Sequence, residues 1–190
     1  MNLKDILDLL TAVGTCAAVI VALYVSLAAS RASSRLASVR AGLVAARHLQ
    51  ELETLENRAR SLTNGLSTLE QNFRTRPTLD VMIDERWLRS LDAINADLLI
   101  ELAPIPRHAA GRLGRAVGAF AYVANQIAMV QKNNMWPVWD ADTRERMVVR
   151  WLDLCASHIT PLQLAIEQCI KAAEEQAPDF TAEEVGNEPG

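Results

Sequence analysis

The sequence predicts an all-α protein: a single N-terminal transmembrane helix continuous with a long helix, followed by a helical bundle of about four helices. Three observations lead to this fold class. Leu and Ala are abundant and runs of β-branched residues are rare, which favours helices over strands. A long uncharged stretch lies near the N-terminus. Most of the remaining chain repeats its apolar residues at steps of three and four, which is the helical period.

The uncharged stretch 9–29 is the predicted transmembrane helix. Its 21 residues would span roughly 31 Å as a helix, which matches a hydrocarbon core of about 30 Å. A cleaved secretory signal and a buried core helix are the alternatives. Residues 26–28 have the small-x-small pattern of a cleavage site, but Asp5, Asp8 and the length of the apolar run argue against a signal. No polar face marks the stretch as a core helix.

Charges on the two flanks predict the orientation of this helix. Only Lys4 precedes the stretch, whereas four arginines follow it before any acid. These are Arg31, Arg35, Arg40 and Arg47. Lys and Arg remain on the cytoplasmic side of a membrane, and such arginines also attract anionic lipid headgroups. We therefore expect a single-pass protein of the inner or plasma membrane, with residues 1–8 outside and the C-terminal domain in the cytoplasm.

A stripe of small residues recurs at every fourth position of the predicted transmembrane helix. Its members are Gly14, Ala18, Ala22 and Ser26. Small side chains let two helix backbones approach closely in lipid. The stripe predicts a homo-oligomer, with a dimer favoured. Chance is the alternative, because Gly and Ala are common in transmembrane helices.

The apolar period continues from Leu36 to Phe73 and forms a heptad-like, coiled-coil seam from Leu52 onward. We expect one helix that runs on from the transmembrane segment and ends before Pro77. At 1.5 Å per residue it is longer than any helix that can pack against it. Residues 30–50 are therefore interpreted as a basic juxtamembrane stalk.

Three further helices are expected to complete a cytoplasmic bundle over 51–177. The first covers about 80–102, and the second covers about 107–132. The third begins near Asp140 or Asp142, either of which can cap it. The apolar stripe of the first consists of Trp87, Leu91, Ile94, Leu98 and Leu102.

Proline and acidic residues shape the end of the chain. Pro161 lies inside the last helix and is expected to kink it. Residues 178–190 carry acids and no base, which predicts an acidic disordered tail. The uncharged stretch 116–130 is interpreted as a buried core helix, and a second membrane-inserted segment is the alternative.

The sequence contains no catalytic signature, so we expect no enzyme, no cofactor and no metal. None of the three histidines follows a Glu by three residues, so the Glu-x-x-His pattern of a helical di-iron site is absent. Ser157 and His158 are neighbours on one helix and are expected to point apart. Cys155 and Cys169 would lie about 21 Å apart, beyond the reach of a disulfide, and are interpreted as buried hydrophobic residues. A net charge of −4 argues against a nucleic-acid partner.

One turn carries the residues that we expect to contact a protein partner: Trp136, Pro137 and Trp139. Exposed Trp side chains are costly unless they bind something. The alternatives are that both rings fold back onto the bundle or enter the membrane interface.

Together these features predict a membrane-anchored, non-enzymatic helical protein that presents a cytoplasmic bundle to a protein partner, for interaction or regulation. The layout is similar to that of many small bacterial inner-membrane proteins, but no motif supports an activity. A membrane-perturbing protein of the holin or toxin kind is the first alternative. An enzyme whose site assembles only in the fold is the second.

Overall fold

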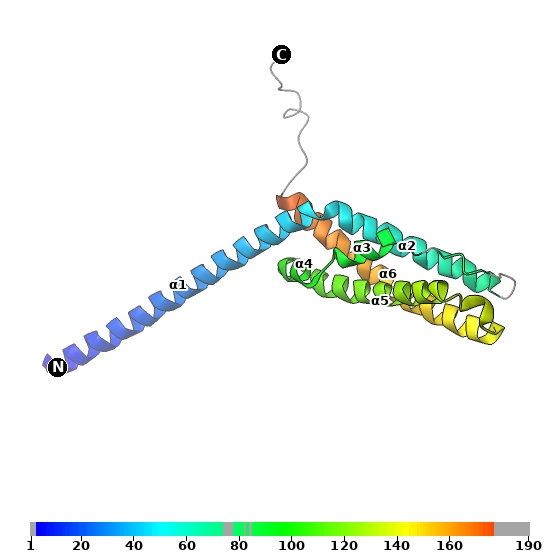
Figure 1. The fold of residues 1–190 in the computed structure, drawn as a ribbon. Helices are drawn as coiled ribbons and strands as arrows, with labels where there is room; N and C mark the ends of the chain where they lie inside the picture. The colour runs from blue at the N-terminus through cyan, green and yellow to red at the C-terminus, as the bar shows by residue number, and fades with distance from the viewer. Residues whose placement is uncertain (1–2, 74–77, 82, 84, 177–190) are drawn as a thin grey trace, which may run out of the picture. The chain divides into compact units, whose positions relative to one another are not determined.

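A computed structural model describes residues 3–73, 78–81, 83 and 85–176, with side chains from residue 19 onward except that of residue 85. The chain divides into two compact units, Met1–Val39 and Arg40–Gly190. The described residues form six α-helices and one short 3-10 helix, and they contain no strand. The all-α class is therefore confirmed (Figure 1). The predicted tail 178–190 lies outside the described residues.

The first helix, α1, covers Leu3–Arg47. It contains the whole predicted transmembrane segment 9–29 and continues beyond it without interruption. The first unit consists of this helix up to Val39, and the last two turns of α1 belong to the second unit. The prediction of one long apolar N-terminal helix is confirmed.

A single residue, His48, separates α1 from α2, which covers Leu49–Asn72. The N–H of His48 donates to the carbonyls of both Val44 and Ala45, at 3.1 and 3.2 Å. The expected unbroken helix is therefore two helices. The apolar seam keeps its period because only one residue leaves the helical conformation.

The last turns of α1 pack against the end of α6, the helix Ala141–Gln176. Ala41 and Ala45 are fully buried. A Cβ on Gly42 would lie 2.5 Å from the carbonyl oxygen of Ala172, so the two backbones approach each other here. The second compact unit thus begins at Arg40 and includes part of the segment predicted as a stalk, 30–50.

Three long helices form the body of the second unit: α2, α5 (Ala109–Lys132) and α6. Helix α6 lies alongside both α2 and α5 and runs antiparallel to them (Figure 1). Gln163 on α6 donates to Glu56 on α2 at 3.2 Å. The α2 side of the core is the predicted seam, which is buried as expected: Leu52, Leu55, Ala59, Leu62, Leu66, Leu69 and Phe73.

The predicted second helix, 80–102, is two short helices, α3 (Glu85–Asp92) and α4 (Ala96–Glu101). Its apolar stripe is nevertheless buried. Asn95 causes the break, because its side-chain oxygen accepts the N–H of Leu98 at 2.9 Å and caps α4. The stripe has the same period in one helix or two, so apolar spacing alone did not reveal the break.

Helix α5 agrees with the predicted 107–132, and its core face occupies the stretch 116–130. Six residues of that stretch are buried within the bundle: Ala116, Phe120, Val123, Ala124, Ile127 and Val130. At the far end of α5, the Gln131 amide donates to the carbonyl of Val81 at 2.7 Å. This bond holds the segment before α3 against the bundle.

Helix α6 begins as predicted beside Asp140. The Oδ1 atom of Asp140 accepts the N–H of Thr143 at 2.7 Å, which identifies Asp140 as the cap in preference to Asp142. Pro161 lies inside α6 and cannot donate to the carbonyl of Ser157 one turn earlier.

Candidate functional site

The first unit carries an exposed apolar surface. Of the described residues, only Val19–Arg47 is a helical segment long and apolar enough to cross a membrane. Its large apolar side chains are between 53% and 74% exposed from Val19 to Leu27. A soluble core helix would instead be covered, because exposing so much apolar surface to water is unfavourable.

The predicted self-association stripe lies on this helix. Ala22 and Ser26 are exposed, so both are accessible to another helix. Gly14 and Ala18 lie in the part of α1 whose side chains are outside the described residues.

The arginines predicted to set topology do not all have the same surroundings. All four are exposed. Arg31 and Arg35 belong to the first unit, whereas Arg40 and Arg47 belong to the second. Arg40 forms an ion pair with Glu101 at the end of α4, at 2.8 Å. An exposed pair of this kind contributes at most about 1 kcal/mol.

The two Trp residues predicted to contact a partner pack against the bundle: Trp136 is buried and Trp139 is half-buried. Trp136 is only 2% exposed, and its ring centroid lies 6.2 Å from that of half-buried Trp139. The Arg144 guanidinium lies 5.4 Å from the Trp136 ring and donates to its carbonyl at 3.0 Å. The ring of Trp136 is therefore not available as a surface, and Pro137 and Val138 form the exposed part of the turn.

The outer face of the α5–α6 pair was not predicted from the sequence. Two neighbouring depressions lie there and share Ser157. The wider depression encloses about 680 Å³, and its walls are both apolar and basic. Its lining residues are Tyr122, Arg146, Val149, Arg150, Asp153, Leu154 and Ser157.

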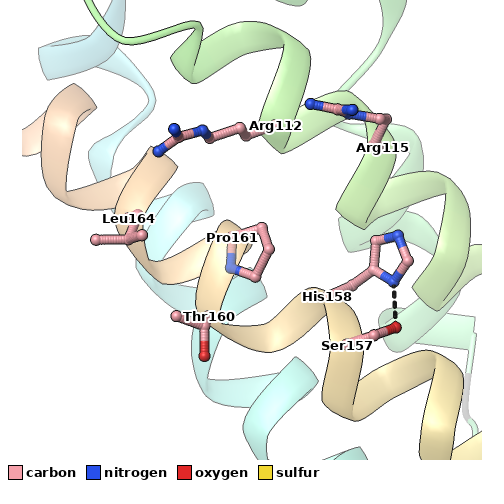
Figure 2. A pocket seen from close by; sticks show the side chains of 7 residues that line it. All are labelled: Arg112, Arg115, Ser157, His158, Thr160, Pro161 and Leu164. Atoms are coloured by element: carbon pink, nitrogen blue, oxygen red, sulfur yellow. Dashed lines mark hydrogen bonds between the residues drawn. The ribbon is translucent and has the colours of Figure 1, made fainter.

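The narrower depression encloses about 380 Å³. Figure 2 shows two arginines from α5 on one side and a group of α6 residues on the other. Its lining residues are Arg112, Arg115, Ser157, His158, Thr160, Pro161 and Leu164. The sequence contained a signal for this face, because each helix carries two arginines three or four residues apart, which places them on one side.

Ser157 and His158 do not point apart as expected. The Ser157 Oγ atom lies 2.9 Å from His158 Nδ1 (Figure 2). Both groups also lie 2.9 Å from the carbonyl oxygen of Leu154. A carbonyl only accepts, so the Ser157 hydroxyl donates its proton to the carbonyl of Leu154.

The other candidate chemistry lies in the core. Cys155 and Cys169 are buried as free thiols, as predicted. Burial raises the pKa of Cys155 from 9.0 to about 12 and that of Cys169 to about 11, so both remain protonated thiols near neutral pH. No group of three or more His, Cys, Asp or Glu residues within the described chain is arranged to hold a metal ion.

Comparison with known proteins assigns no family. No family model, curated protein or solved structure matches the chain. The candidate functional features of the chain are the two α5–α6 depressions and the exposed apolar helix.

Proposed function

We propose that this chain is a membrane-anchored, non-enzymatic helical protein that presents its bundle to a protein partner at the cytoplasmic face of the membrane. The observation that carries the proposal is the exposed apolar stretch of α1 from residue 19 to 29, together with the arginines that follow it. A bilayer would cover this surface, because the whole uncharged stretch 9–29 spans roughly 31 Å as a helix, close to the thickness of a hydrocarbon core.

Orientation follows from the same charges. Arg31 and Arg35 lie directly after the apolar stretch, whereas Lys4 is the only base before it. We therefore propose that the N-terminus is outside and the bundle is cytoplasmic. Self-association through Gly14, Ala18, Ala22 and Ser26 belongs to the same proposal, and exposure of the last two supports it.

We assign the partner contact to the wider α5–α6 depression. Tyr122 is 41% exposed, and it lies with Arg146 and Arg150 around apolar Val149. Aromatic and arginine side chains supply much of the binding energy of protein interfaces. Two arginines against the single acid Asp153 favour a partner with an acidic surface.

Topology and retention of the full chain test the anchoring. Reporters attached before Met1 and after Gly190 should show opposite sides of the membrane, and the intact chain should stay in the membrane after alkaline extraction. Replacing Arg31 and Arg35 with Glu should reduce the fraction with a cytoplasmic C-terminus. A shortened, soluble product outside the cytoplasm would show that the stretch is a cleaved signal.

The membrane potential of the expressing cells distinguishes an anchored interaction protein from a membrane-perturbing one. We expect cells that express the chain to keep their membrane potential, because the second long uncharged stretch, 116–130, contributes six residues to the core of the bundle. Collapse of the potential on expression would favour the membrane-perturbing alternative.

A further inference from the structure

The narrower α5–α6 depression has an excess of positive charge. Arg112 and Arg115 line it, and none of its seven lining residues is acidic. Within the described residues, Arg112 makes no hydrogen bond or ion pair. Arg115 uses its Nε atom to donate to the carbonyl of Gly111 at 3.3 Å. In a chain of net charge −4, these two guanidinium groups have no carboxylate partner in the part of the chain that the structure describes.

The α6 side of the depression supplies further polar groups. Because Nδ1 of His158 is engaged with the carbonyl of Leu154, its Nε2 atom remains available to a ligand. In Figure 2 that nitrogen lies on the side of the ring nearer Arg115. Thr160, which is exposed, lines the same depression. Both groups can exchange hydrogen bonds with an oxygen-rich ligand.

The apolar part of the wall lies beside these groups. Pro161 and Leu164 line the depression, and Leu164 is 42% exposed. Known small-molecule sites enclose about 300–1,000 Å³ and combine apolar walls with a few placed polar groups. A volume of about 380 Å³ therefore suits a small ligand with an anionic group and a short organic part.

We propose that this depression binds a small ligand through a phosphate group. Two guanidinium groups on successive turns offer more donors than one carboxylate can accept, whereas a phosphate presents three oxygens and up to two charges. His158 and Thr160 line the same depression and can add hydrogen bonds, and Pro161 and Leu164 contact the organic part. This inference does not depend on the anchoring of α1, because all of its residues lie in the bundle.

The phosphate can come from a soluble phosphate monoester or from an anionic lipid headgroup, since both present the same oxygens. The first arm of the test uses the full chain in a non-ionic detergent at constant ionic strength. Glycerol 3-phosphate should bind at one saturable site in calorimetry and should raise the melting temperature, because a ligand of the native state stabilises it.

Matched arginine pairs make this measurement specific. Arg112→Ala combined with Arg115→Ala should weaken binding by about tenfold or more, since each lost charge-assisted bond is worth roughly that factor. Arg146→Ala combined with Arg150→Ala removes the same charge from the neighbouring depression and should leave binding within about twofold. Melting without ligand confirms that each variant folds. If both double substitutions weaken glycerol 3-phosphate binding equally, the binding reflects general charge attraction and the proposal is overturned.

The second arm places the full chain in lipid nanodiscs with phosphatidic acid or with phosphatidylcholine alone. A higher melting temperature with phosphatidic acid, abolished by Arg112→Ala with Arg115→Ala, assigns the phosphate to a lipid. Binding of glycerol 3-phosphate without this lipid effect assigns it to a soluble ester. The proposal is wrong if neither probe binds, whatever the topology of α1.

Discussion

At the scale of single residues, Asp140 shows how one side chain sets the start of a helix. Its carboxylate accepts the N–H of Thr143 at 2.7 Å. Hydrogen bonds from the side chain and then the backbone of Thr143 are the main causes that lower the pKa of Asp140 below 3.8, and Arg146 and Arg144 add to them. The charged form is therefore the one that the folded state favours.

We expect Asp140→Ala to lower the melting temperature of the full chain in detergent at neutral pH. Because the pKa is lower in the folded state, the contribution of Asp140 is complete above its ordinary value of 3.8 and is lost as the pH falls through the folded value. The difference in melting temperature between wild type and Asp140→Ala should therefore shrink below pH 3.8. Circular dichroism over this pH range measures it.

Asp140→Asn is the matched control, because Asn also accepts an N–H at a helix N-terminus and does not titrate. It should retain most of the stability at neutral pH. If Asp140→Asn lowers the melting temperature as much as Asp140→Ala does, then charge rather than capping stabilises this end of α6.

At the scale of helices, the junction between α1 and α6 depends on small residues. Ala41 and Ala45 are fully buried, and no side chain fits at Gly42, where a Cβ would lie 2.5 Å from both the carbonyl oxygen of Ala172 and Cγ of Gln176. The carbonyl belongs to the backbone of α6, so relief requires the two helices to move apart.

We expect Gly42→Ala to destabilise the bundle by about 1–3 kcal/mol, the usual cost of overpacking a close contact. Gly118→Ala is the control, because a Cβ there meets nothing within 4 Å. That substitution should stabilise the bundle by about 0.5–1 kcal/mol, because Ala favours a helix over Gly. Chemical unfolding followed by circular dichroism measures the free energy of unfolding of both variants. A higher free energy of unfolding for Gly42→Ala than for wild type would contradict the close approach of α1 and α6.

At the scale of the whole molecule, the described part of the bundle encloses an apolar core with no buried charged or hydrophilic side chain. One polar atom, Nε1 of Trp151, is buried without a hydrogen-bond partner among the described residues. Cys155 and Cys169 share this core and are both fully buried. They therefore report on opening of the bundle as a unit.

We expect both thiols to resist a thiol reagent at pH 8 until denaturant unfolds the bundle. Cys16→Ala should serve as the parent chain, so that only these two thiols are counted. Their pKa values are raised in the folded state, so their contribution to stability is complete below pH 9.0 and is lost as the pH rises toward 11 and 12. The free energy of unfolding should fall over that range.

An exposed thiol provides the control for this labelling experiment. Val138 is 82% exposed, so Val138→Cys in the same parent chain should react at once. Immediate reaction of Cys155 or Cys169 in the native chain would contradict the packed core.

The sequence by itself determined the helical class, the α2 seam, the span of α5 and the start of α6, because periodicity and capping are local properties of a chain. It did not determine the breaks at His48 and before α4, since one non-helical residue at His48 and three between Asp92 and Ala96 leave the apolar period almost unchanged. Only the tertiary structure showed that Gly42 lies against α6 and that Trp136 is buried. It also brought Arg112 and Arg115 to the same depression as His158. These positions are distant in sequence, and only the packing of whole helices brings them together.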